Sequence, residues 1–404
     1  GLASGCFLRA STASWMVATG LLLACSPMHI WYSQEARMYI LLALLVTFSA
    51  GFCWRLVRGE RGWLPYLICT VLALYTHYFA LFVVLAENVF MLAWLGLSGR
   101  QDNRTPPRQS LLYKWLGVQA ALVLVFSPWL PVAVYQARFH QMSWVAPPSL
   151  FKLAGTALAM VLGDAGLGPL GAAALAALGA AIVWSAWREQ RAGRWEVIEG
   201  YAFALNWLAV PFATVALLSL IVPLFQVKQM LMLLPPLLIL SAAALVRLPR
   251  PAQVVLAAVL AWLVVRSLGT MYQTETKDGW REAAAYLQSH YRPGDVIYLN
   301  PAAGALVLDA YLAGTLPREG YPPEYDVRTG GWEGEPVTAA VAEREMTALA
   351  ADYGRVWLVE FVPEFWDAQG YLRAWLEENG SSVSEQRFSE IEVRLYRFVR
   401  EPSR

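Results

Sequence analysis

Residues 63–97 read WLPYLICTVLALYTHYFALFVVLAENVFMLAWLGL, and this apolar stretch decides how the chain is organised. A helix needs about 20 apolar residues to cross a bilayer, so the stretch is too long for one straight crossing. Arginines flank it on both sides: Arg55, Arg58 and Arg61 before it, and Arg100, Arg104 and Arg108 after it. Because Lys and Arg concentrate in cytoplasmic loops, both flanks belong on one side. We therefore predict two short crossings with a turn near residues 76–78.

Seven further apolar runs are long enough to cross a bilayer, which brings the predicted total to nine crossings. They are residues 11–31, 38–57, 112–134, 169–187, 201–222, 230–246 and 252–269. With nine crossings the other basic clusters all fall on the side of the first arginines, which we take as cytoplasmic. Residues 149–163 are short for a crossing and are expected to form an interfacial or re-entrant helix on the outer face.

The composition agrees with a membrane protein. Hydrophobic residues make up 57% of the 404 residues and charged residues 15%, against roughly 45–50% and 25% in soluble domains. The net charge of +1 provides no basic surface, so nucleic acid is not an expected partner. The four cysteines, Cys6, Cys25, Cys53 and Cys69, lack metal-ligand spacing and are expected to be buried thiols without a role.

The tail changes character, because stretches typical of helices and strands alternate there. Helices are predicted at 278–291 (with Asp278 as N-cap), 302–313, 337–353 and 366–379, and strands at 295–300, 355–361 and 388–398. The predicted fold is thus a polytopic α-helical membrane domain, residues 1–270, followed by a small exported α/β domain, residues 271–404. The tail has no Gly-rich phosphate loop and no His/Cys cluster, so we assign it no chemistry; a lid, a docking surface and a stabilising role remain open.

Two charged residues, Glu35 and Arg37, lie between the first two predicted crossings. They are two positions apart, so on a helix they would point in different directions and neutralise each other poorly. Unpaired charge beside hydrocarbon is expensive and marks a candidate functional site. The alternative is interfacial snorkelling with ion pairs to other helices.

Two further polar clusters are expected on the same outer face. His77 lies among aromatic residues and is either a ligand for a sugar, a phosphate or a metal, or a structural cap of the turn. Lys228 is one of four lysines in the chain and precedes Gln229; an ammonium there suits a phosphate, and the alternative is an anchor lysine. Glu87 and Asn88 are expected to form hydrogen bonds to other helices, with a proton relay as the alternative.

Other residues have weaker interpretations. Asp164 is expected to cap the end of the outer helix, and Trp31, Tyr32 and Trp144 could line a groove for a sugar or a prenyl chain. No complete set of metal ligands is visible in the sequence, and a divalent metal remains possible.

Several stretches resemble one enzyme family. They are SPMHIWYSQEARMYILLALL (26–45), YTHYFALFVVLAENVF (75–90), KQMLMLLPPLLIL (228–240), KDGWREAAAYL (277–287) and PGDVIYLN (293–300). Together they resemble bacterial polytopic glycosyltransferases of family 39, in the GT-C superfamily, which are related to dolichyl-phosphate-mannose–protein mannosyltransferases. The resemblance implies a plasma-membrane enzyme that transfers a sugar from a polyprenyl-phosphate donor to a protein, lipid or glycan acceptor on the outer face, with inversion.

The resemblance also bears on site residues. The leaving phosphate needs fixed positive charge or hydrogen-bond donors, and Arg37 and Lys228 are the candidates, with His77 as a third. The family's catalytic acidic residue lies in the first outer loop, which is expected upstream of Gly1. We therefore assign that role to none of Glu35, Glu87 and Asp164, and expect a chain that starts at Gly1 to be inactive.

Two other classes stay open: a transporter or flippase of lipid-linked sugars, and a membrane scaffold without catalytic activity. A transporter needs a transmembrane path, for which Glu87 and Asn88 are the strongest polar pair and no inverted repeat is evident. A scaffold would leave Arg37 and Lys228 unrelated in space. The enzyme hypothesis predicts that Arg37, His77 and Lys228 converge within roughly 10–15 Å on one outward-facing cavity.

Overall fold

A computed structural model describes residues 2–35, 37–97, 108–139, 149–163, 168–222, 224–273, 279–312, 316–326 and 331–398. The chain divides into two compact units. The helical unit comprises Gly1–Ala133 and Val145–Met271, and the α/β unit comprises Val134–Trp144 and Tyr272–Arg404.

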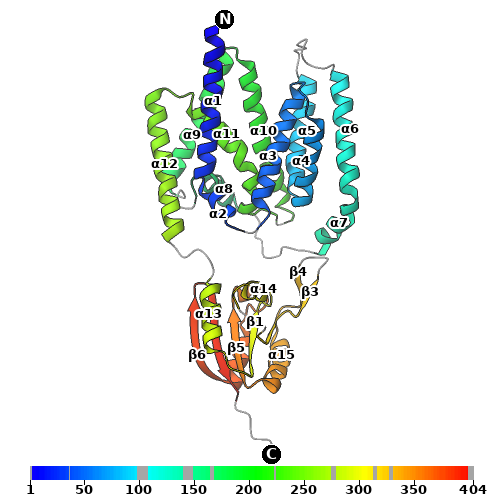
Figure 1. Cartoon of the computed structure of the whole chain (residues 1–404), viewed down its shortest axis with the longest axis vertical. Coiled ribbons are helices and arrows are strands. Elements are labelled where there is room, and N and C mark those ends of the chain that lie inside the picture. The colour runs from blue at the N-terminus through cyan, green and yellow to red at the C-terminus, as the bar shows by residue number, and fades with distance from the viewer. Residues whose placement is uncertain are drawn as a thin grey trace, which may run out of the picture. The chain divides into compact units, whose positions relative to one another are not determined.

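The helices that precede residue 274 follow the apolar runs of the sequence (Figure 1). They are α1 (Leu2–Cys25), α2 (Pro27–Ser33), α3 (Tyr39–Val57), α4 (Trp63–Thr76), α5 (Ala80–Leu97), α6 (Arg108–Phe126), η1 (Ser127–Trp129), α7 (Leu130–Phe139), α8 (Leu150–Leu162), α9 (Pro169–Arg191), α10 (Trp195–Leu218), η3 (Val227–Leu233), α11 (Leu234–Leu245) and α12 (Arg250–Gln273). The run predicted at 11–31 is interrupted: α1 ends at Cys25, and Pro27 begins the separate helix α2.

Six helices of the described residues are long and apolar enough to cross a membrane. They are Tyr39–Val57, Arg108–Gln136, Pro169–Arg191, Trp195–Leu218, Val227–Leu245 and Arg250–Gln273. The other apolar helices, Ser14–Cys25, Trp63–Thr76, Ala80–Gly96 and Phe151–Leu162, are shorter. The length and composition of the six helices indicate a membrane protein, and the predicted total of nine crossings stays a prediction.

The stretch 63–97 forms two helices, as predicted. Helix α4 ends at Thr76, His77 adopts an extended backbone as its C-cap, and α5 begins at Ala80. Aromatic side chains fix the turn, because Trp129 Nε1 donates to the Tyr78 hydroxyl at 2.9 Å and the Tyr75 hydroxyl donates to the Val125 carbonyl at 2.8 Å. Tyrosine and tryptophan with one polar group and one apolar body are typical of a membrane–water interface.

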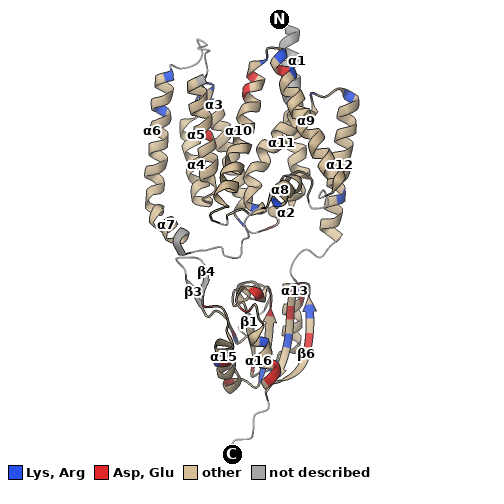
Figure 2. Ribbon diagram, turned by 180° about the vertical axis from the view of Figure 1, so that it is seen from behind, with Lys and Arg blue, Asp and Glu red and all other residues tan. Residues whose placement is uncertain are grey.

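Of the arginines that the sequence groups on one side, Arg58, Arg194 and Arg247 lie at one end of the helical unit, while Arg100 and Arg104 lie outside the described residues. Ion pairs between helix ends establish this: Arg58 pairs with Glu196 and Glu199, and Arg194 and Arg247 both pair with Glu189. These pairs join the last turn of α3, the first turns of α10 and the C-terminal ends of α9 and α11. We call this the basic end; Figure 2 shows Lys and Arg concentrated there.

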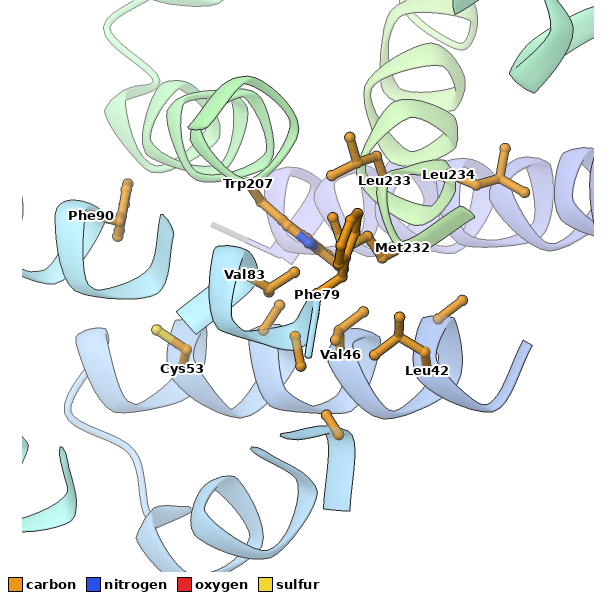
Figure 3. Packing of buried hydrophobic residues seen from close by; sticks show 14 of the residues in the cluster. Leu42, Val46, Cys53, Phe79, Val83, Phe90, Trp207, Met232, Leu233 and Leu234 are labelled. Carbon is orange, nitrogen blue, oxygen red and sulfur yellow. The ribbon is translucent and has the colours of Figure 1, made fainter. Parts of the chain in front are cut away.

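The core of the helical unit forms where α3, α5, α10 and η3 meet. Leu42 and Val46 of α3 pack with Phe79 and Met232 in this cluster (Figure 3). The outer helix faces are apolar as well: on α6, Val123 and Leu124 are 71% and 73% exposed. An apolar exterior of this kind is what contact with lipid requires.

Helix α8 ends in a close contact with two other helices. Its C-cap, Gly163, has a positive φ of 69°. A Cβ at this position would overlap Ser267 Oγ of α12 and would lie 2.9 Å from Pro27 Cβ of α2. Glycine is therefore required here both for its backbone conformation and for space.

The variant Gly163→Ala is expected to destabilise the helical unit by roughly 2–4 kcal/mol, from the left-handed backbone and the overpacking together. Gly193→Ala is the matched control, because Gly193 has a φ of 66° and nothing within 4 Å; it should cost only about 1 kcal/mol. Thermal unfolding in detergent measures both. Equal losses in the two variants would show that the contact with α2 and α12 contributes nothing.

The α/β unit is built around a mixed five-stranded sheet. Its elements are α13 (Trp280–His290), β1 (Asp295–Asn300), α14 (Gly304–Leu308), β2 (Arg318–Gly320), β3 (Glu324–Asp326), β4 (Gly331–Glu333), α15 (Ala339–Asp352), β5 (Arg355–Glu360), η4 (Pro363–Phe365), α16 (Tyr371–Asn379), β6 (Ser381–Phe388) and β7 (Ile391–Arg397). The strand order is β2-β1-β5-β7-β6; β2, β1 and β5 are parallel, and β7 is antiparallel to β5 and β6. Helices α13 and α14 cover one face and α15 and α16 the other.

The predicted strands 295–300 and 355–361 and the helix 337–353 are confirmed to within two residues, while other predictions for the tail need correction. The helix predicted at 302–313 is only the short α14, Gly304–Leu308, and the strand predicted at 388–398 begins at Ile391. Strand β6 was missed, because its side chains are mostly exposed and polar at the sheet edge. Helix α16 begins at Tyr371 rather than 366, since the Asp367 carboxylate caps it by accepting from Tyr371 N at 2.7 Å. Helix α13 has Gly279 as its N-cap, and Asp278 lies outside the described residues.

Candidate functional site

The first candidate stretch folds as the short helix α2 and a loop that leads into α3. Ser26 caps α2, because its hydroxyl accepts from the backbone N–H of His29 at 3.3 Å. Trp31 Nε1 then donates to Glu35 Oε1 at 3.1 Å. The indole of α2 thus holds the Glu35 carboxylate in the loop.

Glu35 and Arg37 do pair with each other, contrary to the prediction. Arg37 Nη1 lies 3.6 Å from Glu35 Oε2, and the backbone N–H of Arg37 donates to the Glu35 carbonyl at 2.8 Å. The prediction assumed helical geometry, but both residues lie in the loop, where side chains two apart can turn toward each other. Arg37 is 56% exposed at its side chain and Glu35 28%, so the guanidinium still has an open side.

Tyr39, the first residue of α3, joins the separate candidates into one group. Its ring centroid lies 5.9 Å from Lys228 Nζ and 5.8 Å from the His77 ring. Tyr32 of α2 approaches the same ring edge-on at 6.0 Å. Lys228 also interacts electrostatically with Arg37 and Glu35. We call Glu35, Arg37, Tyr39, His77 and Lys228 the Tyr39 cluster.

The sequence did not single out Tyr39, although it lies two residues after Arg37. The available signal was its place as the first helical residue next to a charged loop, where an aromatic ring can meet a cation. The cluster lies at the N-terminal end of α3, opposite the basic end, where α3 terminates.

His77 enters this cluster with a defined tautomer. The backbone N–H of Phe79 donates to His77 Nδ1 at 3.1 Å, so the proton of the neutral ring belongs to Nε2. Burial, together with the positive charge of Lys228, lowers the pKa of His77 to about 4. At neutral pH the ring is therefore an uncharged donor through Nε2 rather than a cation.

We expect His77 to remain neutral from pH 8 down to about pH 5. In the unfolded chain its pKa returns to the ordinary value of about 6.5, so between pH 6.5 and about 4 the unfolded state binds a proton that the folded state does not. Stability therefore falls as the pH drops through this window. Histidine NMR, assigned with His77→Gln, should show no titration of His77 above pH 5, and Lys228→Met should raise its pKa. A His77 that titrates near 6.5 would contradict the buried placement.

The other predicted residues behave differently. Gln229 is 4% exposed, and its Oε1 accepts no hydrogen bond in the described part of the chain, so no hydrogen bond to this oxygen links it to the Tyr39 cluster. Asp164 and Trp144 lie outside the described residues. Within the described ranges, no group of three or more His, Cys, Asp or Glu side chains could hold a metal ion.

The α/β unit contains a separate cavity of about 430 Å³ at the end of β5. Its charged lining residues are Glu360, Glu364, Asp367, Arg373, Arg387, Glu390 and Glu392. Several of them already have structural tasks: Glu360 and Glu392 pair with Arg394, and Asp367 caps α16. We therefore treat this cavity as part of the framework of the sheet.

The Tyr39 cluster has the composition of an anion site. Two cations, Arg37 and Lys228, face one carboxylate, Glu35, and His77 adds a neutral donor. Such a set suits a phosphate, which takes both charge and hydrogen bonds. The comparison of this chain with protein-family models, curated proteins and solved structures finds no match. The resemblance to family 39 glycosyltransferases thus stays a prediction, and the function rests on the geometry of the site.

Proposed function

We propose that this protein is a membrane glycosyltransferase that takes a sugar from a polyprenyl-phosphate carrier and transfers it to an acceptor, with inversion. In this proposal the Tyr39 cluster lies at the outer face of a bacterial plasma membrane, with the basic end in the cytoplasm. The observation that carries the proposal is the proximity of His77 and Lys228 to the ring of Tyr39, together with the electrostatic interaction between Arg37 and Lys228.

The chemistry of the donor explains why this arrangement supports the proposal. A polyprenyl-phosphate sugar has a hydrocarbon chain, a charged phosphate and a polar sugar, so its site must combine an apolar surface with cations at the membrane rim. The helical unit has exposed apolar faces, and the Tyr39 cluster lies at the ends of its helices. Arg37 and Lys228 would stabilise the charge that develops on the phosphate as the sugar leaves, and His77 would donate through Nε2.

The proposal assigns no general base and leaves the acceptor open. Glu35 is engaged by Trp31 and Arg37, so we do not assign it the role of deprotonating an acceptor hydroxyl. The proposal includes no metal ion. The transfer assay, run with and without a divalent ion, shows whether the reaction depends on one.

The direct test measures carrier binding and sugar transfer separately. The chain is reconstituted in proteoliposomes, and binding of a short-chain polyprenyl phosphate is compared with that of the uncharged polyprenol of equal length. We expect clear selectivity for the phosphate, which tests the site without requiring transfer; the transfer assay then shows whether the residues present suffice for catalysis. Equal binding of phosphate and alcohol would refute the proposal. Movement of a labelled lipid-linked sugar across the bilayer without transfer would instead favour the flippase class.

A further inference from the structure

A cluster of polar side chains lies inside the helical unit, away from the Tyr39 cluster. Its centre is Glu87 of α5, which is only 2% exposed. Side chains from α3, α4 and α6 surround it, as the sequence predicted when it placed Glu87 and Asn88 against other helices. The hydrogen bonds confirm that prediction: Asn88 accepts from Trp115 Nε1 at 2.9 Å and donates to Gln119 Oε1 at 3.2 Å.

Each oxygen of the Glu87 carboxyl group meets one hydroxyl. Tyr66 of α4 donates its hydroxyl proton to Glu87 Oε2 at 2.8 Å, and the same Tyr66 hydroxyl accepts from Gln119 Nε2 at 3.3 Å. Glu87 Oε1 lies 2.7 Å from Ser49 Oγ of α3. Ser49 Oγ in turn lies 2.8 Å from Thr70 Oγ1 of α4.

The chain of contacts ends on a backbone carbonyl. Thr70 Oγ1 lies 2.7 Å from the carbonyl oxygen of Tyr66, which can only accept. The series Glu87 Oε1, Ser49 Oγ, Thr70 Oγ1, Tyr66 O therefore contains three short oxygen–oxygen contacts. Each contact needs one proton between its two oxygens.

The two hydroxyl groups supply only two of the three protons. Thr70 donates to the Tyr66 carbonyl, and Ser49 donates to Thr70. The contact between Ser49 and Glu87 then has no proton unless the carboxyl group carries it. With an ionised Glu87, one of these contacts would bring two lone pairs together at 2.8 Å or less.

The surroundings of Glu87 also disfavour a negative charge on its carboxyl group. Among the described residues, no Lys, Arg or His lies within ion-pair distance of Glu87. The titratable groups that face it are Tyr66 from α4 and Cys53 from α3. Helices α6 and α10 contribute uncharged groups near it, Gln119 and Asn206. An uncompensated buried carboxylate costs several kcal/mol, more than any neutral member of such a network.

We infer that Glu87 is a proton-binding site: it is a neutral carboxylic acid whose O–H donates to Ser49 while its other oxygen accepts from Tyr66. The bound proton completes the chain that joins α3, α4 and α5. When it leaves, the O–H bond breaks, the electron pair stays on the carboxylate and the proton passes to water. Helix α3 begins at Tyr39, and α4 ends next to His77. The same series of hydrogen bonds therefore holds together the two helices that carry these residues. The inference does not depend on the proposed function.

Substitution by glutamine tests the inference. A glutamine can donate from Nε2 to Ser49 and accept from Tyr66 through Oε1, which reproduces the pattern of the neutral acid. We expect Glu87→Gln to unfold in detergent within a few degrees of the wild type, and Glu87→Ala to unfold well below it. An ionised Glu87 predicts instead a clear change in the unfolding temperature of Glu87→Gln, because the substitution would then remove a charge from the network.

The chain offers a matched control in Glu189. It is 3% exposed, like Glu87, but it pairs with Arg194 and Arg247. Since its charge has partners, Glu189→Gln should lower the unfolding temperature where Glu87→Gln does not. Equal tolerance of both substitutions would show that the assay does not read the charge state, and would remove the support for a neutral Glu87.

Infrared difference spectroscopy reads the proton directly and does not need a destabilised variant. At pH 7, the spectrum of wild type minus Glu87→Gln should contain the carbonyl stretch of a protonated, hydrogen-bonded carboxyl group, which shifts in D₂O. Loss of a carboxylate stretch in its place would overturn the inference.

Discussion

Replacing Lys228 with methionine is expected to weaken the binding of a short-chain polyprenyl phosphate by about 10- to 100-fold. Hydrogen bonds to charged groups contribute roughly 1.5–3 kcal/mol each, and about 1.4 kcal/mol corresponds to a tenfold change in affinity. Methionine keeps the unbranched apolar stem, so the packing of η3 should survive while the ammonium is lost. The binding is measured in proteoliposomes, together with the unfolding temperature.

The same loss is expected for Arg37→Gln, because the structure places both cations in the Tyr39 cluster. Lys152→Met is the matched control: this lysine belongs to α8 of the same unit, and within the described residues no ion pair or ring contact joins it to the cluster. It should change binding by less than twofold. Uncharged polyprenol should bind equally well to all these variants. If neither Arg37→Gln nor Lys228→Met weakens phosphate binding, the assignment of the site is wrong.

In the α/β unit, Arg394→Ala is expected to cost about 3–5 kcal/mol of stability, the range for removing one partner of a buried ion pair. Arg394 is 6% exposed and pairs with Glu360 at 2.7 Å, with Glu385 at 3.0 Å and with Glu392. Without the guanidinium, the buried carboxylate of Glu360 has no compensating charge at this distance. Hydrogen exchange of β5 and β7 in the full chain measures the loss.

The loss should depend on pH. Burial raises the pKa of Glu360, and the charge of Arg394 opposes that rise. In Arg394→Ala the pKa of Glu360 therefore rises further, and the carboxyl group accepts a proton more readily in the folded state. Since a protonated Glu360 needs no partner, the destabilisation should shrink as the pH falls toward the pKa of Glu360 and grow as the pH rises above it.

An exposed arginine of the same sheet provides the control. Arg387 is 63% exposed and pairs with Glu390 and Glu392 at the surface. Such pairs contribute at most about 1 kcal/mol, so Arg387→Ala should lower stability only slightly and without a marked dependence on pH. A loss in Arg394→Ala no larger than this would mean that solvent reaches Glu360.

The sequence predicted a large part of the architecture because apolar length and periodicity are local properties. Each apolar run that the sequence identified before residue 270 contains a helix. The turn between the two helices of residues 63–97 lies where the polar His77 interrupts the apolar residues. The strand at 295–300 is fully buried and could be recognised from its continuous apolar run. The exposed strand β6 could not, because its place in the sheet depends on its pairing with β7 rather than on its own composition.

By itself, the sequence determined that the chain is rich in apolar helices, that clusters of arginine recur between them on one side and that a small α/β unit follows. These features depend on residue type and spacing within a few helical turns. Only the tertiary structure decided that Arg37 pairs with Glu35 and that Tyr39 lies next to Lys228 and His77. It also decided that Glu87 ends a series of three oxygen–oxygen contacts for which the two hydroxyl groups supply only two protons. Most of those contacts join residues 21 to 189 positions apart, or residues in a loop with no periodic rule, and only the packing of α3 against α4, α5 and η3 brings them together.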